Sequence, residues 1–264
     1  MQSHLAAATM FLGSRGGAGM RAVVVFLMLA GFVWSASAEA PEKSPEDAVV
    51  RLTAAVDIDT DGNVAALKWL NEKPALKIFT NAVTSEVTQW KFEPGTLNGA
   101  PAATRTYLAL AILARPNEAG GISLTVKAAS TGMNLSNPVV PSYPTAGVVN
   151  GVNATVRAIV DFDVNGKGTI RSTEYTASRS RYDKHFLKAV AAAVDAWRVE
   201  PETVGGRPVA GTISIPFVFC VQVEWCAKRR AGAKGEDNTT PVALGSATKL
   251  RSEVEGLSIG SIAS

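Results

Sequence analysis

Three acidic residues spaced two apart could bind a hard cation. Asp57, Asp59 and Asp61 precede Gly62, as in the opening of an EF-hand calcium loop, where alternating carboxylates surround the ion. The twelfth position of such a loop requires a bidentate glutamate, but it is Lys68 here. Because Asp-Gly also favours the positive φ angles of a tight hairpin, we predict a turn at this place and no metal ion.

A serine between two glycines could serve as a nucleophile. Gly256, Ser258 and Gly260 fit the Gly-x-Ser-x-Gly pattern, which works only on a sharp turn from a strand into a helix. Four residues follow Gly260, too few for that helix. We therefore predict that Ser258 is not catalytic.

One histidine, His185, follows the first 38 residues and could act as a base or a metal ligand. Its neighbours at helical spacing are Arg181, Lys188 and Ala189, which offer neither a carboxylate to orient the ring nor a second ligand. We predict a solvent-exposed histidine on a helix. Since no pattern supports catalysis, we expect no enzyme, no cofactor, no metal ion and no small-molecule substrate.

The first residues have the features of a secretory signal. Met20-Arg21 precedes an apolar run from Ala22 to Trp34, and Ser35-Ala36-Ser37-Ala38 provides an A-x-A cleavage site. We predict a signal peptide at 1–38, then a linker at 39–47, and a periplasmic location. An uncleaved inner-membrane anchor is the alternative, although the apolar run is shorter than the about 20 residues that span a bilayer.

The predicted mature chain is nearly neutral. Residues 1–38 hold two of the 26 basic residues, Arg15 and Arg21, and none of the 23 acidic ones, so 24 basic residues remain. Binding to nucleic acid requires a concentrated basic face. We therefore expect no nucleic-acid partner.

Two cysteines, Cys220 and Cys226, remain in the predicted mature chain. In an oxidising compartment such a close pair favours a disulfide, with two free thiols as the alternative. A straight strand would hold the two Cα atoms about 20 Å apart, so a turn must separate them if the bond forms.

An internal repeat organises the chain. At an offset of 107 residues, 10 of the 23 positions from 79 to 101 are identical to those from 186 to 208. Four of these pairs follow helix spacing and predict an amphipathic helix in each copy with the same buried stripe. The pairs are Phe79 with Phe186, Val83 with Val190, Val87 with Val194, and Trp90 with Trp197.

Period-two alternation predicts a strand before each helix, at 52–58 and 156–162. Asp61-Gly62 and Asn165-Gly166 predict hairpin turns into second strands. After each helix, Glu-Pro interrupts the helical backbone and a third strand follows. The second strands are expected at 63–70 and 168–176, and the third at 104–113 and 209–221.

The predicted fold class is therefore α+β, with two tandem small modules. Each module is expected to be a three-stranded antiparallel sheet packed against one main helix. The first module is placed at 48–116, a connector at 117–140, the second module at 141–226 and a flexible tail at 227–264.

The second copy resembles the C-terminal domain of the TonB family. The resemblance rests on Tyr143-Pro144, the small residues 146–151, Asp161-Phe162-Asp163, and the run Trp197-Arg198-Val199-Glu200-Pro201 with Gly206-Arg207-Pro208. The first copy matches from the hairpin to the third strand and lacks the Tyr-Pro start. In this family the domain lies in the periplasm and grips a short peptide of an outer-membrane transporter, which adds as an extra strand to the sheet.

The resemblance implies a partner-binding site on the third strand and on the segment before the first one. Its residues would be Val140, Pro141, Ser142, Tyr143, Val209, Gly211, Ile213, Ile215, Phe217 and Phe219. A contact glutamine of the family corresponds to Val140, so that polar contact is missing here. The expected partner is an outer-membrane receptor or another envelope protein. A structural scaffold or a homodimer, in which the modules pair with each other or with a second chain, is the alternative.

Overall fold

The structure is a computed structural model that describes residues 47–70, 73–135, 138–221, 224 and 241–262. The predicted signal peptide, most of the linker and Cys226 lie outside the described residues, so the structure does not test them. Within the described part, no helix is long and apolar enough to cross a membrane.

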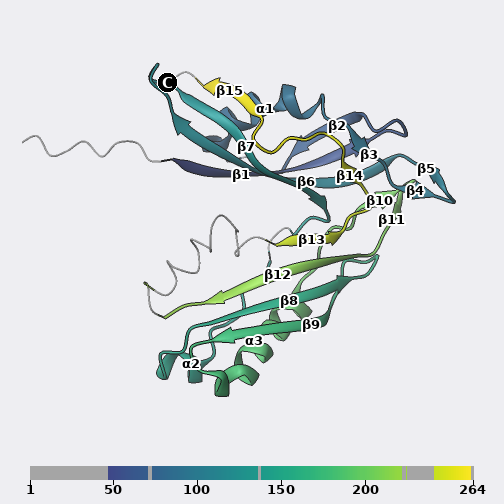
Figure 1. The fold of residues 1–264 in the computed structure, drawn as a ribbon. Coiled ribbons are helices and arrows are strands. Elements are labelled where there is room, and N and C mark those ends of the chain that lie inside the picture. Colours follow the sequence, from purple (N-terminus) through teal and green to yellow (C-terminus); the bar gives the residue numbers. More distant parts are fainter. Residues whose placement is uncertain (1–46, 71–72, 136–137, 222–223, 225–240, 263–264) are drawn as a thin grey trace, which may run out of the picture. The chain divides into compact units, whose positions relative to one another are not determined.

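The chain is α+β, rich in strands and with few helices (Figure 1). The N-terminal elements are β1 (Ala48–Ile58), β2 (Val64–Trp69), η1 (Pro74–Leu76), α1 (Lys77–Val87), β3 (Phe92–Glu93), β4 (Thr96–Leu97), β5 (Ala100–Pro101), β6 (Thr104–Pro116) and β7 (Ile122–Gly132). The next are α2 (Thr145–Val149), β8 (Ala154–Phe162), β9 (Gly168–Ala177), η2 (Ser180–Tyr182), α3 (Asp183–Ala196), β10 (Thr203–Val204), β11 (Arg207–Pro208) and β12 (Gly211–Phe219). The last are β13 (Val242–Gly245), β14 (Lys249–Leu250) and β15 (Ser258–Ile262).

Both predicted modules contain strand, strand, helix and strand in the same order. Three antiparallel strands, β2-β1-β6, form the centre of the first, and β9-β8-β12 form that of the second. Neither sheet stops at three strands, however. The first grows to seven by adding β7, β10, β11 and β15, and the second to four by adding β13. The repeat did not predict β10 and β11, although residues 203–208 lie within it, because two-residue strands carry no alternation, whereas β13 and β15 come from outside the repeat.

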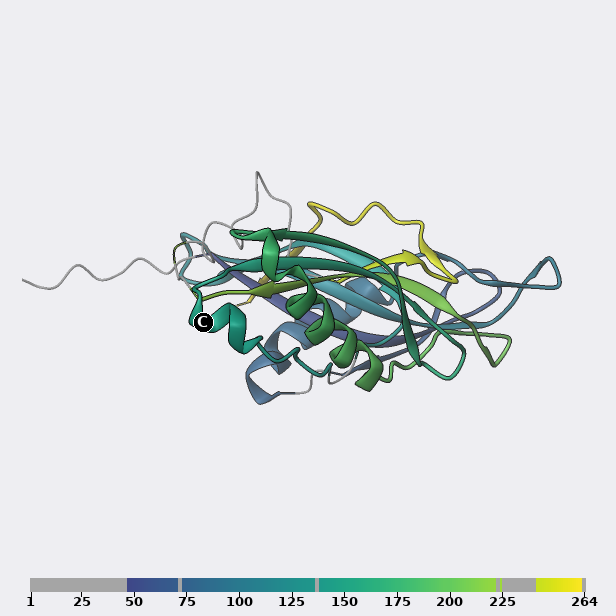
Figure 2. The same cartoon turned by 90° about the horizontal axis from the view of Figure 1, so that it is seen from below.

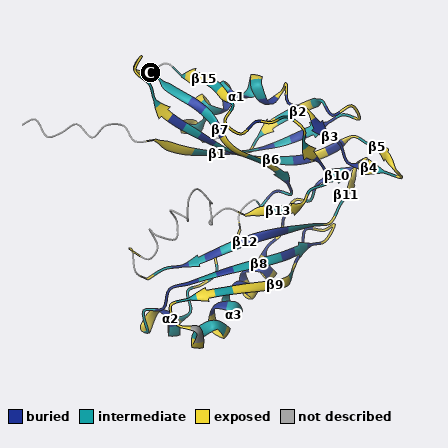
Figure 3. Cartoon of the chain, in the orientation of Figure 1, coloured by how far each residue is buried: buried dark blue, intermediate teal, exposed yellow. Residues whose placement is uncertain are grey.

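The helices cover one face of each sheet through the predicted stripes. Val83, Val87 and Trp90 are buried in the first hydrophobic core, and Phe79 packs against its edge. In the second core all four equivalent side chains are buried, and α3 lies on one face of the four-stranded sheet (Figure 2). The strands show the predicted alternation of buried and less buried residues (Figure 3).

The helices end earlier than the Glu-Pro motif suggested. Trp197 already has extended backbone angles, φ −74° and ψ 145°, directly after α3. Its indole N–H donates to the carbonyl oxygen of Val139 at 2.8 Å. Burial of the ring and this hydrogen bond hold Trp197 out of the helix, four positions before Pro201. The interpretation of Trp90 and Trp197 as core residues is confirmed, since they are only 3% and 5% exposed.

The glycine of each hairpin turn is required for two reasons. Gly62 and Gly166 have φ angles of 85° and 74°, as the turn prediction requires. In addition, the chain leaving the helix passes directly over them. A Cβ at Gly62 would lie 2.1 Å from the carbonyl oxygen of Phe92, and one at Gly166 would lie 1.9 Å from that of Val199. The backbone N–H groups of Phe92 and Val199 donate back to the glycine carbonyls at 2.9 and 3.1 Å.

The prediction of a flexible tail at 227–264 is wrong for residues 241–262, which lie along both sheets. β13 pairs with β12, β14 with β3, and β15 with β7. The strands are short, with weak alternation, and their pairing partners are far away in sequence. Val254 in this segment is buried in the first core.

The connector also forms more structure than predicted. A strand, β7, begins within the predicted connector at Ile122 and extends to Gly132, and it pairs with β6 along Tyr107 to Pro116. Leu124 and Val126 enter the first core, so residues 122–132 are an integral strand of the first sheet.

Replacing Gly166 with alanine should destabilise the protein more than the same change at Gly99. Both glycines have positive φ, which costs a non-glycine residue about 1–2 kcal/mol. Only Gly166 also faces a carbonyl, because nothing lies within 4 Å of a Cβ at Gly99. We expect a loss of about 3 kcal/mol or more for Gly166→Ala in urea unfolding. Equal losses for the two variants would contradict the close approach.

Candidate functional site

The candidate site is the edge of the four-stranded sheet at β12. Residues 211–219 pair with β8 without a register shift, and Pro216 lies opposite Arg157. Proline has no N–H to donate, so this cannot be a pair that exchanges two hydrogen bonds. The neighbouring residues on β12 therefore bond to β8, and alternate residues direct their backbone groups toward the edge. The outward residues are Thr212, Ser214, Pro216 and Val218.

The predicted contact side chains on this strand face the core. Four of them are buried in the second core. A strand added at this edge would therefore meet β12 through backbone groups, as β-augmentation requires. The four are Ile213, Ile215, Phe217 and Phe219. Gly211 begins the strand, and Val209 lies before it, with its N–H donating to the Glu202 carbonyl at 2.9 Å.

The segment before α2 is anchored to the same core. The hydroxyl of Tyr143 donates to the carbonyl of Val152 at 2.6 Å, and its ring packs edge-on against Phe186 and Phe219 at 5.7 and 5.5 Å. Burial raises the pKa of the Tyr143 phenol, which therefore stays a donor at neutral pH. Val140, by contrast, is 82% exposed. Pro141 is half-buried and Ser142 exposed, in the loop between Val140 and Tyr143.

The chain itself occupies part of the β12 edge. β13 pairs antiparallel with β12, opposite Thr212, Ile213 and Ser214. Among the described residues, no strand pairs with this side of residues 215–219. The edge is thus filled over its first half and open over its second half. β13 could not be predicted from the sequence, because its four residues are too few for a clear alternation.

A buried carboxylate fixes the chain directly after β13. Glu202 is 2% exposed and accepts hydrogen bonds from the Ser246 hydroxyl at 2.7 Å and the Ala247 N–H at 2.8 Å. A third bond comes from the hydroxyl of Thr106 on β6 at 2.5 Å. The Glu202 side chain therefore ties residues 246–247, which directly follow β13 of the second sheet, to β6 of the first sheet. We call these four residues the Glu202 cluster.

Glu200, two residues earlier, makes a second contact between the sheets. Its backbone exchanges hydrogen bonds with Asn134, and its carboxylate accepts from the Asn134 side-chain amide at 2.9 Å. Burial and the charge of Glu200 raise the pKa of Tyr107 on β6 to about 12. The Glu-Pro-Glu sequence, predicted only as a helix stop, therefore joins the two sheets.

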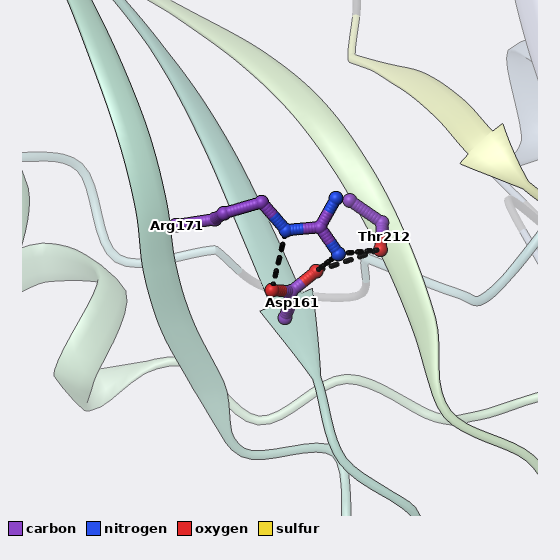
Figure 4. Close-up of polar contacts among 3 residues, drawn as sticks. All are labelled: Asp161, Arg171 and Thr212. Carbon is purple, nitrogen blue, oxygen red and sulfur yellow. Dashed lines mark hydrogen bonds and ion pairs between the residues drawn. The ribbon is translucent and has the colours of Figure 1, made fainter.

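The outward residue Thr212 is also held by its side chain (Figure 4). Its hydroxyl donates to Asp161 at 2.7 Å, and Arg171 makes a two-pronged ion pair with the same carboxylate at 2.6 and 2.8 Å. The Thr212 hydrogen bond and then Arg171 lower the pKa of Asp161. This group joins β8, β9 and β12 at the end of the edge where β13 pairs.

The corresponding edge of the first module is fully covered. β6 is the counterpart of β12, and its residues Thr104 and Arg105 pair with β10 from the second module. From Tyr107 onward it pairs with β7. β1 pairs with the other side of β6 from Thr104 to Ala114, so nearly the whole of β6 has a strand on each side.

The other sequence patterns do not form catalytic or metal centres in the described part of the chain. Asp59 uses its carboxylate to accept the N–H groups of Asp61 and Asn63 and the Asn63 amide, which lowers its pKa and closes the predicted turn. His185 is exposed on α3. Ser258 begins β15 in an antiparallel pair and not on a strand-to-helix turn. No group of three metal-binding side chains occurs within the described residues.

Comparisons with known proteins point to the second module. The family described as Gram-negative bacterial TonB protein C-terminal matches residues 139–221. Two proteins named Protein TonB, from Xanthomonas campestris pv. campestris strains B100 and ATCC 33913, are each 32% identical to this chain over 93 residues. The match covers 35% of this chain and 40% of each relative, so the chain spans less than half the length of these relatives. These findings support a TonB C-terminal domain at residues 139–221.

Removing the Glu202 carboxylate should weaken the whole assembly. Glu202→Ala leaves one buried and two part-buried donors without this acceptor, and we expect a loss of about 3 kcal/mol in urea unfolding. Glu202→Gln keeps one acceptor oxygen and should lose less. Glu255→Ala, at an exposed carboxylate, is the matched control and should change stability by about 0.5 kcal/mol or less. A loss for Glu202→Ala no larger than that of the control would contradict this role.

Proposed function

We propose that this chain is a TonB-like envelope protein that binds an extended segment of a partner by strand addition at β12. The partner would be an outer-membrane receptor or another envelope protein, and the role would be linked to transport across the outer membrane. The supporting observation is that β12 directs backbone groups toward one edge, where Thr212 and Ser214 pair with the short strand β13 and Val218 pairs with no described strand, within the segment similar to TonB C-terminal domains. Unpaired edge groups of this kind accept an added strand.

The four-stranded sheet ends at β9 on one side and, on the other, at β12 with the short β13 beside it; one observation favours β12 over β9. The chain already adds an antiparallel strand, β13, to β12. The same strand position is filled on β6 by β7 and β10. β12 and its counterpart β6 thus both accept an added antiparallel strand on the same side. We therefore propose that the partner segment pairs on this side of β12.

We propose that the first module, residues 48–116, supports the second and binds no partner of its own. Its element order is the same, and the hairpin glycines Gly62 and Gly166 are crossed in the same way, which favours two copies of one ancestral module. Its receiving strand has no free side. The indole N–H of Trp90 has no hydrogen-bond partner among the described residues, whereas that of Trp197 bonds to Val139. The first copy thus lacks the contact that the segment before α2 supplies in the second.

A structural scaffold is the second candidate function. The observation that favours it is the pairing of β10 with β6, which consumes one edge within the chain. In this reading the remaining strand edges, β12 or β9, would pair with a second copy to form a homodimer. The two functions differ in whether a foreign segment binds at β12.

The remaining proposals follow from the envelope assignment. We place the protein in the periplasm, with a binding and not a catalytic role. Cys220 follows β12, and we propose that it pairs with Cys226 in a disulfide, as the oxidising compartment favours.

A peptide array tests the partner class. The array would carry overlapping ten-residue segments from the periplasm-facing ends of the outer-membrane receptors of the same organism, and the labelled mature protein would be applied to it. We expect a small set of segments to bind. Val218→Pro should weaken this binding at least tenfold, because it removes the outward N–H in the open half of the edge.

Val218→Ala keeps that N–H and is the matched control, so it should bind as the unaltered protein does. Absence of any binding segment, together with a dimer that survives dilution, would favour the scaffold. Equal binding by Val218→Pro and Val218→Ala would place the site away from the open half of β12, residues 215–219.

A further inference from the structure

β13 is a strand of the chain's own that occupies an edge suited to a partner strand. Since Ser214 directs its backbone groups outward, Ser214 and Val242 form the hydrogen-bonded pair of this short ladder. A register shift lies between Thr212 and Ile213, so that Gly245 is opposite Thr212. The pairing ends at Val242, one residue after Pro241.

Little apolar burial holds β13 in place. Val242 and Leu244 are 47% and 54% exposed, so their side chains contribute only part of the free energy of a buried aliphatic residue. The remaining contacts are the backbone pairs with β12 and the Glu202 cluster immediately after the strand. A segment with so few buried contacts opens locally at a small fraction of the global unfolding free energy.

We propose that residues 241–245 are a placeholder strand, which an incoming segment replaces at Thr212 to Ser214 of β12. The proposal rests on the proposed function of β12 and adds where the partner binds and what it must displace. Glu202 acts as the hinge: it holds residues 246–247 while the strand before them leaves. A partner segment therefore encounters β12 with β13 already paired to it, and must displace β13 to bind there.

The placeholder also indicates the chemistry of the segment that replaces it. Ala243 is opposite Ile213 and lies against Gly132 of β7, since a Cβ at Gly132 would come within 2.9 Å of the Ala243 Cβ. The space there admits a small side chain only. The residues on either side, Val242 and Leu244, are exposed and uncharged. We therefore assign to this position an extended uncharged segment with a small residue between two aliphatic ones.

Pro216 sets the length of the new ladder. An added strand that runs past Ser214 finds no donor at Pro216, and its next outward partner is Val218. A segment that pairs at Thr212 and Ser214 therefore gains two complete backbone pairs, whereas one confined to residues 215–219 gains one. Displacement therefore exchanges the two pairs of β13 for two new ones, and the incoming segment gains a further pair when it is long enough to reach Val218.

A peptide with the chain's own sequence tests the exchange. The probe is residues 239–248, fluorescently labelled, and its binding to the full mature chain is followed by anisotropy. In the unaltered protein the tethered β13 has an effective concentration on the order of millimolar, so a micromolar peptide competes poorly. Val242→Pro removes the N–H that β13 donates to Ser214, and we expect the peptide to bind this variant at least tenfold more tightly.

Val242→Ala is the matched control, because it keeps the N–H and shortens a half-exposed side chain; it should bind as weakly as the unaltered chain. The peptide carrying Ala243→Leu should bind the Val242→Pro variant at least tenfold more weakly, since Gly132 leaves no room. Equal binding to Val242→Pro and Val242→Ala would overturn the proposal.

Amide hydrogen exchange tests the proposal on the unaltered chain, without any substitution that could affect folding. If β13 opens alone, the N–H groups of Thr212 and Ser214 exchange at least tenfold faster than those of Ile215 and Phe217, which bond to β8. Equal protection of the four would show that β13 is a permanent strand and would overturn the proposal. If Thr212 and Ser214 exchange faster as expected but no receptor segment binds the array, the placeholder proposal is supported and the proposed partner class is wrong.

Discussion

A carboxylate can be buried only where donors surround it, because an unpaired charge in the interior costs several kcal/mol. Glu202 meets this condition with donors from two distant parts of the chain, Thr106 on β6 and the Ser246-Ala247 segment after β13. All of these must be in place together, since each missing donor leaves part of the desolvation cost unpaid. The cluster therefore couples the first sheet, the second sheet and the C-terminal segment. The position of β13 on β12 depends on that coupling.

The repeated part of the sequence predicted the local structure well, because its signals are local. Alternation from 52 to 58 and from 156 to 162 became β1 and β8, and the stripe ending at Trp197 became the buried face of α3. The turn at Gly166 was also predicted from its need for a positive φ angle, but the close approach of the Val199 carbonyl was not. Its contact with Val199 links residues 33 positions apart, and no pattern within the turn contains that information.

The candidate site could be predicted only in part. The resemblance placed it on β12, yet the buried faces of Ile213 and Phe217 and the orientation imposed by Pro216 follow from the strand register, which needs both strands. The tail was misread because β13 and β15 owe their structure to strands more than 25 residues away, with little local preference of their own. No local sequence pattern marks Glu202. Its burial follows from donors at residues 106 and 246, which sequence spacing does not connect.

The two modules handle the same edge in different ways. On β6 the edge is closed by β7, which brings Leu124 and Val126 into the core, so its removal would expose a large apolar surface. On β12 the edge is closed over three residues by a strand whose aliphatic side chains remain half in water. The first arrangement is a permanent part of the fold, and the second costs little to undo.

An exposed strand edge is a hazard, since any extended chain can pair with it, and proteins protect such edges with proline, short strands or covering segments. β12 has two of these protections on different halves: Pro216 removes a donor where the edge is open, and β13 covers Thr212 to Ser214. Proline is permanent, but a paired strand can be exchanged. The half covered by β13 can therefore be both protected and selective. A segment that replaces β13 must fit beside Gly132, and only such a segment re-forms the hydrogen bonds that are lost when β13 leaves.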